Sequence, residues 1–136
     1  MSLKKNKSVL FLAMIFLFLF FGETIAQPLN FPVHVRITNT MASNVTIHCK
    51  SKNDDLGIHV IPSGQYYEWG FRVNLWGTTL FFCGFTTKKG GGVYDIFEAK
   101  RDVPRCRDHT CYWGVKDDGV HGYNGDATDI WFKWKS

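Results

Sequence analysis

The stretch "CKSKNDDLGIHV", residues 49–60, contains the adjacent carboxylates Asp54 and Asp55, which could serve a glycosidase or bind calcium. A glycosidase needs two carboxylates that flank the scissile bond at a defined separation, which a sequence alone does not show. A calcium loop needs acidic residues at alternating positions followed by a distal glutamate, and that spacing is missing here. The composition Asn53-Asp54-Asp55-Leu56-Gly57 instead favours a turn between two strands.

Histidine and cysteine offer a second kind of chemistry, metal binding. If "VHVRITN" and "VTIHCKS" pair as a hairpin, with Val33 opposite Cys49, His34 lies opposite His48 on the outward face. The spacing supplies no third ligand for that pair. A zinc site built on Cys106, His109 and Cys111 lacks a Cys-x2-Cys pair. Gly-x-Ser-x-Gly and His-Glu-x-x-His motifs are also missing from the sequence. We therefore expect no catalytic residues, no metal and no cofactor.

The start of the chain indicates secretion. Lys4, Lys5 and Lys7 precede an apolar run at residues 9–21, and Thr24-Ile25-Ala26 resembles a signal-peptidase site, so residues 1–26 are read as a cleaved signal peptide. The alternative, an uncleaved anchor, needs a longer apolar run. The mature chain, residues 27–136, is then one secreted domain, and no second apolar segment predicts its insertion into a membrane.

The charge of the mature chain is close to balance. The full sequence has 16 basic and 12 acidic residues, and loss of three lysines and one glutamate with the leader leaves 13 and 11. This small excess gives no indication of nucleic-acid binding.

The four cysteines all lie in the mature part and predict two disulfides in an oxidising compartment. Three pairings are possible. Because long loops gain more from closure than short ones, we expect Cys49 to pair with Cys111 and Cys83 with Cys106.

Period-two alternation of apolar residues recurs along the mature chain, and no segment shows ten residues of helical periodicity. The expected strands are residues 33–37, 45–49, 57–61, 65–71, 79–85, 93–99, 111–115 and 127–134. Short strands at this spacing predict an all-β fold, an immunoglobulin-like antiparallel β-sandwich stabilised by the two disulfides.

Two surface features remain. Asn44-Val45-Thr46 is an N-glycosylation sequon at the tip of the expected first hairpin, so Asn44 is a candidate glycan site. The segment "KRDVPRCR" concentrates Lys100, Arg101, Arg105 and Arg107 around a proline and a cysteine. It is either an ordinary solvated loop or a contact surface for an acidic partner.

Four segments together resemble the plant self-incompatibility protein family, the S-protein homologues: "VHVRITNT", "HCKSKNDDLGIHVIPSGQYYEWGF", "LFFCGF" and "CRDHTCYW". The resemblance covers nearly the whole mature chain. It implies a small secreted β-sandwich with two disulfides and no catalytic activity, in which the Asp-Asp-Leu-Gly turn defines the fold. It also implies a ligand that meets a plasma-membrane partner on pollen and leads to rejection of self pollen.

We therefore expect a monomeric, non-enzymatic recognition protein that binds an unidentified plasma-membrane receptor. Its specificity would lie in the surface loops 39–44, 88–92, 100–107 and 117–125, held by a rigid sandwich. The alternative is a secreted defence protein that binds microbial surfaces or glycans.

Overall fold

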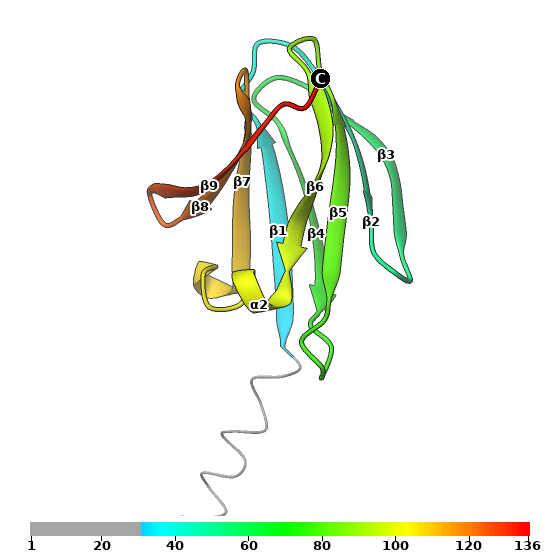
Figure 1. The fold of residues 1–136 in the computed structure, drawn as a ribbon, viewed down its shortest axis with the longest axis vertical. Helices are drawn as coiled ribbons and strands as arrows, with labels where there is room; N and C mark the ends of the chain where they lie inside the picture. Colours follow the sequence, from blue (N-terminus) through cyan, green and yellow to red (C-terminus); the bar gives the residue numbers. More distant parts are fainter. Residues whose placement is uncertain (1–30) are drawn as a thin grey trace, which may run out of the picture.

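The computed structural model describes residues 31–136, so the expected signal peptide lies outside the described residues. This part of the chain folds into nine β-strands, a short helix and a 3-10 turn (Figure 1). The elements are β1 (Pro32–Asn39), β2 (Val45–Lys50), β3 (Asp55–Ile61), β4 (Tyr66–Arg72), β5 (Leu80–Thr86), β6 (Gly91–Glu98), α2 (Ala99–Asp102), η2 (Arg107–His109), β7 (Thr110–Lys116), β8 (Gly119–Asn124) and β9 (Ala127–Lys133). None of the helices within residues 31–136 has the length and apolar character needed to cross a membrane.

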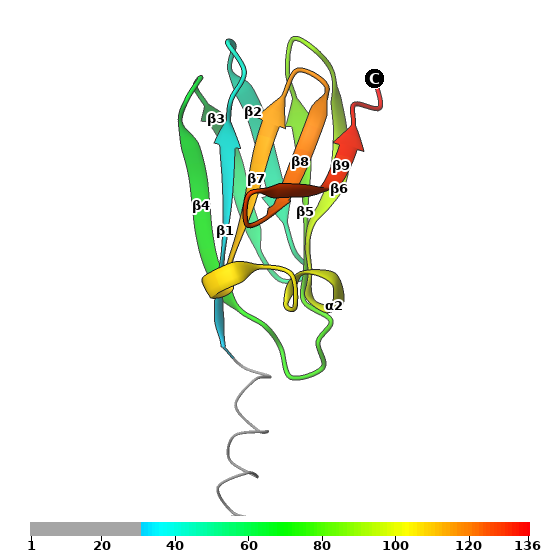
Figure 2. The same ribbon diagram turned by 90° about the vertical axis from the view of Figure 1, so that its left-hand side faces the viewer.

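The strands form two sheets that pack as a sandwich, which confirms the expected fold class. One sheet has the order β4-β1-β7-β8-β9, seen from its outer side in Figure 2, and the other has the order β3-β2-β5-β6. Neighbouring strands run antiparallel except for β1 and β7, which are parallel. The sandwich therefore departs from the purely antiparallel arrangement at this one pair.

The expected hairpin between the first two strands was wrong. β1 pairs with β4 and β7, whereas β2 lies in the other sheet between β3 and β5. Alternation tells which face of a strand is buried but does not name its partner, and the connection at residues 40–44 crosses from one sheet to the other. Both strands still bury the expected face, with Val35 and Ile37 on β1 and Val45 and Ile47 on β2.

The core between the sheets is aromatic. Phe71 contacts Phe81 and Phe97, at ring-centroid distances of 4.6 and 4.8 Å. Trp113 is 1% exposed and stacks on Phe132. Burial of rings of this size supplies much of the apolar contact that a domain of about 100 residues needs.

The expected disulfide pairing was also wrong. The structure joins Cys49 to Cys83 and Cys106 to Cys111. Cys49 and Cys83 lie directly opposite each other on β2 and β5, with 4.0 Å between their Cα atoms, so the sheet register places them in bonding distance. The second bridge closes a short loop around η2. Loop-closure entropy ranks pairings by length, but strand register decided between them here.

Strand β8 was missed, and the loop expected at residues 117–125 largely consists of it. Its sequence, "GVHGYN", interrupts the alternation with two glycines. Gly122 is required by packing, because a Cβ atom there would lie 2.9 Å from the Trp113 ring. A contact with a ring on a neighbouring strand leaves no periodic signal in the sequence.

Candidate functional site

Most surface loops of the sandwich lie at two opposite ends, while the turn between β8 and β9 projects from the side (Figure 1). One, here called the α2 end, contains residues 51–54, 73–79 and 99–109; the 73–79 connection shares one hollow with residues 51–54 and another with residues 99–104. The other, here called the carboxyl end, contains residues 40–44, 87–90 and 117–118 together with the C-terminus. The loops expected to carry specificity therefore do not lie on a single surface.

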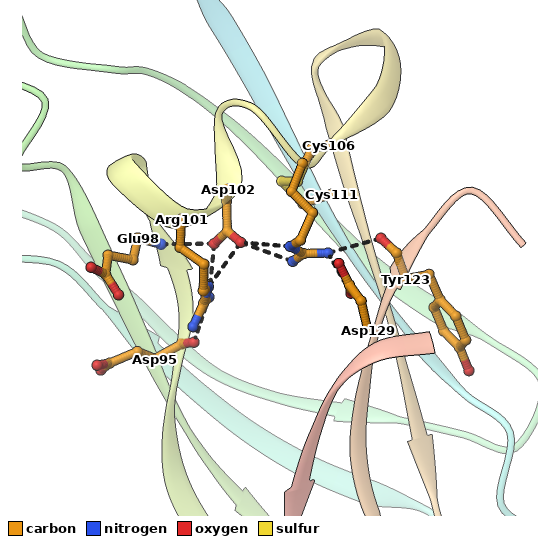
Figure 3. A network of polar contacts seen from close by, with 9 residues as sticks. Asp95, Glu98, Arg101, Asp102, Cys106, Cys111, Tyr123 and Asp129 are labelled. Atoms are coloured by element: carbon orange, nitrogen blue, oxygen red, sulfur yellow. Dashed lines mark hydrogen bonds and ion pairs between the residues drawn. A yellow bond between two sulfur atoms is a disulfide. The ribbon is translucent and has the colours of Figure 1, made fainter. Parts of the chain in front are cut away.

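A buried aspartate organises the α2 end (Figure 3). Asp102 is fully buried and accepts hydrogen bonds from the backbone N–H of Glu98 at 2.8 Å and from Nε and Nη2 of Arg101 at 2.9 and 2.7 Å. Nε of Arg105 donates a fourth hydrogen bond at 3.0 Å. A buried carboxylate is stable only when it is paired and hydrogen-bonded, and both conditions hold here.

The two arginines extend this network to other strands. Arg101 donates from Nη2 to the carbonyl of Asp95 on β6, at 2.9 Å. Arg105 donates from Nη1 to the carbonyl of Tyr123 on β8, at 2.8 Å, and lies 3.3 Å from Asp129 on β9. Both guanidinium groups also lie over the Trp113 ring, at 5.6 and 5.4 Å from its centroid. Asp102 thus ties the segment 99–109 to both sheets.

This arrangement separates the four basic residues of the candidate contact loop into two kinds. Arg101 and Arg105 are engaged inside the molecule, and only 8% of the Arg105 side chain is exposed. Lys100 and Arg107 are exposed on the surface of the same segment. Only two of the four basic residues are therefore available to a partner. The internal contacts of the other two hold the backbone of the segment in place.

Residues 51–54 form a turn between β2 and β3, as the composition predicted, and Asp55 is the first residue of β3. Asp54 accepts a backbone hydrogen bond from Ser51 and donates its own N–H to the Ser51 hydroxyl. Asp55 accepts the N–H of Gly57 at 2.9 Å, and Gly57 has the positive φ of 79° that glycine permits. Nε2 of His48 lies 2.6 Å from the same carboxylate. The Gly57 N–H and then the His48 ring lower the pKa of Asp55 below its ordinary value.

The structure does not bring His34 and His48 together, although the expected hairpin placed them opposite each other. His34 lies on β1 against Gly70 of β4, whereas His48 lies on β2 beside Asp55. Among residues 31–136 no three metal-binding side chains gather into a site. A third histidine, His121 on β8, pairs with Asp118 at 2.7 Å and lowers the pKa of that carboxylate.

The candidate glycan site, Asn44, is exposed in the loop between β1 and β2 at the carboxyl end. This loop is built on Asn39, which is fully buried. The Asn39 amide donates to the carbonyls of Ser43 and Ile61, and its oxygen accepts the N–H of Met41. Asn44 is therefore presented by an ordered loop, and its occupancy by a glycan stays a prediction.

The structural roles of three residues were missed in the sequence: Asn39 and Asp102, which lie within expected loops, and Asn74, which shapes the connection between β4 and β5. Each is a polar side chain whose role depends on backbone groups that the fold brings to it. Asp102 carried one usable signal, an acid placed between Arg101 and Arg105 at helical spacing.

Comparison with known proteins assigns the family. The profile described as "Plant self-incompatibility protein S1" matches residues 34–134. The chain belongs to this family. S-protein homolog 27 of Arabidopsis thaliana is 40% identical over 147 residues, which cover 98% of this chain and 96% of that relative. S-protein homolog 5 of the same plant is 45% identical over 107 residues, which cover 76% and 82%.

A solved structure of self-incompatibility protein homologue (SPH) proteins has a similar fold. It matches with a TM-score of 0.56 and 16% identity, and covers 77% of this chain and 96% of that chain. The SPH proteins are described there as a widespread family of small, highly stable, secreted proteins from plants. The resemblance drawn from the sequence is confirmed, and with it the expected secretion. Neither this description nor that of the family profile names a catalytic activity.

Proposed function

We propose that this protein is a secreted, non-enzymatic recognition protein, a ligand for a plasma-membrane receptor of plant cells. It would act in pollen–pistil self-incompatibility or in related cell–cell signalling. The observation that carries the proposal is the segment 99–109, whose backbone is fixed by the buried Asp102 network while Lys100 and Arg107 stay exposed. A pre-organised loop loses little conformational entropy on binding, which favours affinity for a protein partner.

The electrostatics of this segment indicate what the receptor surface should offer. Lys100 and Arg107 flank the internal arginines, and Arg107 also packs against the β8–β9 turn, where a Cβ atom on Gly125 would lie 2.9 Å from its guanidinium carbon. The Arg107 guanidinium therefore lies beside this turn. An acidic patch on the receptor would complement these two cations, and charges at the rim of an interface mainly accelerate association.

The test is binding of the oxidised, secreted protein to intact pollen and to vegetative plant cells. A Lys100→Ser/Arg107→Ser variant removes the exposed cations and leaves the Asp102 network intact. A Lys88→Ser/Lys89→Ser variant removes the same charge from the carboxyl end, where both lysines are exposed. We expect saturable binding that the first variant weakens by about tenfold and the second leaves within about twofold.

Each outcome bears on the proposal. Saturable binding to pollen supports a reproductive ligand, and binding only to vegetative cells supports signalling outside reproduction. Saturable binding that both double variants weaken equally shows that the effect is one of net charge, so the α2 end is not the contact surface. Absence of saturable binding to either cell type contradicts the receptor-ligand function.

A second candidate, a defence protein that binds microbial glycans, has one specific observation in its favour. Three aromatic side chains are exposed on the five-stranded sheet: Tyr66, Tyr112 and Trp131, at 55%, 46% and 49%. Arg36 lies between the two tyrosines, 4.1 and 5.7 Å from their ring centroids. Flat aromatic rings beside polar groups can stack on sugar rings. Inhibition of microbial growth by the folded protein, lost in a Tyr66→Ser/Tyr112→Ser variant, would favour this candidate.

A further inference from the structure

The connection between β4 and β5 is a short, internally braced loop at the α2 end. Asn74 is its organising residue: its side chain donates to the Thr78 hydroxyl and accepts the Thr78 N–H, both at 2.9 Å. The N–H of Asn74 in turn donates to the Thr79 hydroxyl at 2.8 Å. The turn closes with a hydrogen bond from the N–H of Gly77, at φ 67°, to the carbonyl of Asn74. The loop is therefore shaped by its own side chains.

This braced loop presents two large apolar side chains to solvent. Leu75 is 64% exposed and Trp76 is 85% exposed, the highest value among the exposed large apolar side chains of residues 31–136. We call these two residues the apolar tip. A rigid turn that holds adjacent leucine and tryptophan in water has no folding advantage, because neither side chain is buried in the molecule.

Cationic side chains lie on both sides of the apolar tip. Trp76 shares a groove with Lys52 and Arg72, which also contains Asp54. On the other side of the loop, Gly77 shares a mainly apolar hollow with Lys100 and Val103. The tip is thus an apolar projection flanked by more positive than negative charge.

We propose that the apolar tip is a membrane-docking site that inserts Leu75 and Trp76 into the interfacial region of an anionic lipid bilayer, while Lys52 and Lys100 contact lipid headgroups. This peripheral site is distinct from a transmembrane segment, and it shares Lys100 with the proposed receptor-contact surface. The sequence predicted no membrane insertion because the mature chain has no second long apolar segment, and two apolar residues at a loop tip lie outside that criterion.

Three features favour a lipid surface over the pocket of a protein. Tryptophan prefers the membrane interface, where its apolar ring is removed from water while its N–H stays close to polar groups. The backbone N–H groups of Asn74, Gly77 and Thr78 are bonded within the loop, as a low-dielectric surrounding requires. The flanking lysines match the negative potential of anionic headgroups, which attracts basic residues close to the surface.

The test is co-sedimentation of the secreted, disulfide-bonded protein with protein-free vesicles. One set contains phosphatidylcholine alone and the other an equimolar mixture of phosphatidylcholine and phosphatidylserine. We expect binding to the mixed vesicles, a decrease with added salt, and a blue shift of the tryptophan emission. A Leu75→Ser/Trp76→Ser variant should bind at least about tenfold more weakly and lose the blue shift. A Lys52→Ser/Lys100→Ser variant should weaken binding to the mixed vesicles by about tenfold.

An Ile58→Thr/Val60→Thr variant is the matched control, because these two residues on β3 are 68% and 57% exposed and lie outside the tip. It should bind vesicles like the wild type. All four proteins should unfold at similar temperatures, because each changed side chain is exposed. Two results would overturn the proposal: no binding to the mixed vesicles, or equal loss in the control and tip variants. In the first case, binding to plant plasma-membrane vesicles that protease treatment abolishes would show that the partner is a membrane protein.

Discussion

The two ends of the sandwich are each built on one fully buried polar side chain, Asp102 at the α2 end and Asn39 at the carboxyl end. Asn39 is neutral and bonds three backbone groups of its own loop and of β3. Asp102 is an acid that needs two arginines, and those arginines reach β6, β8 and β9. A neutral amide organises its surroundings locally, whereas a buried charge must recruit opposite charges and so couples distant strands.

The largest expected effect is at Asp102. Asp102→Ala removes the acceptor of four donor atoms and leaves the mostly buried guanidinium of Arg105 without its closest counterion. We expect a loss of about 3 to 5 kcal/mol in the free energy of unfolding, measured by denaturant titration. Asp129→Ala, which removes the more exposed partner of Arg105, should cost about 1 kcal/mol or less. Equal costs for the two variants would show that Asp102 does not anchor the α2 end.

The two disulfides link different parts of the molecule: Cys49–Cys83 joins two strands of one sheet, and Cys106–Cys111 closes a loop at the α2 end. Cys49–Cys83 spans 34 residues, and Cys106–Cys111 spans five. Loop closure predicts that the Cys49→Ser/Cys83→Ser variant loses about 4 kcal/mol and the Cys106→Ser/Cys111→Ser variant about 2 kcal/mol. Peptide mapping of the non-reduced protein checks the pairing directly. A peptide that joins Cys49 to Cys111 would contradict the structure.

Asn39 should matter less than Asp102 but more than an exposed asparagine. Asn39→Ala leaves two carbonyls and one N–H without their partner in a dry site, which costs about 2 kcal/mol in unfolding free energy. Asn74→Ala is the matched control at the α2 end, because it removes two similar side-chain hydrogen bonds where water can replace them. We expect it to cost less than about 1 kcal/mol. A larger loss for Asn74→Ala would contradict the role assigned to burial.

The same contrast explains what the sequence could predict. Alternating residues such as Val33, Val35 and Ile37 predicted strands and their buried faces, since burial repeats with the period of the backbone. The pairing of the strands could not be predicted in the same way. β1 pairs with β4 and β7, and this choice depends on contacts between segments far apart in the chain. The basic segment 100–107 was found as a charge cluster, but its division into internal and exposed cations depends on where Asp102 lies. Trp76 was overlooked because exposure at a loop tip has no pattern.

The smallest expected effects concern two exposed acids, Asp55 at the start of β3, next to the α2 end, and Asp118 in the turn before β8. Both have a pKa below the ordinary value, but the causes differ. At Asp55 the main cause is the N–H of Gly57, with His48 second, whereas at Asp118 it is the His121 ring. NMR titration of the carboxylates should therefore show that His48→Phe raises the pKa of Asp55 only in part. His121→Phe, which keeps a ring against Trp131, should return Asp118 to its ordinary range.

The sign of the linked stability follows from these directions. Because each folded-state pKa is depressed, each acid stabilises the fold above its unfolded pKa of about 4, and this contribution is lost as the pH falls through the folded value. Asp55→Asn and Asp118→Asn should thus lower the unfolding temperature at neutral pH and converge with the wild type in strong acid. In a His121→Phe background, Asp118→Asn should show no such pH dependence, while in a His48→Phe background Asp55→Asn should retain it. If both dependences vanished together, the Gly57 N–H would not be the main cause at Asp55, and the α2 end would rely on a histidine as the turn before β8 does.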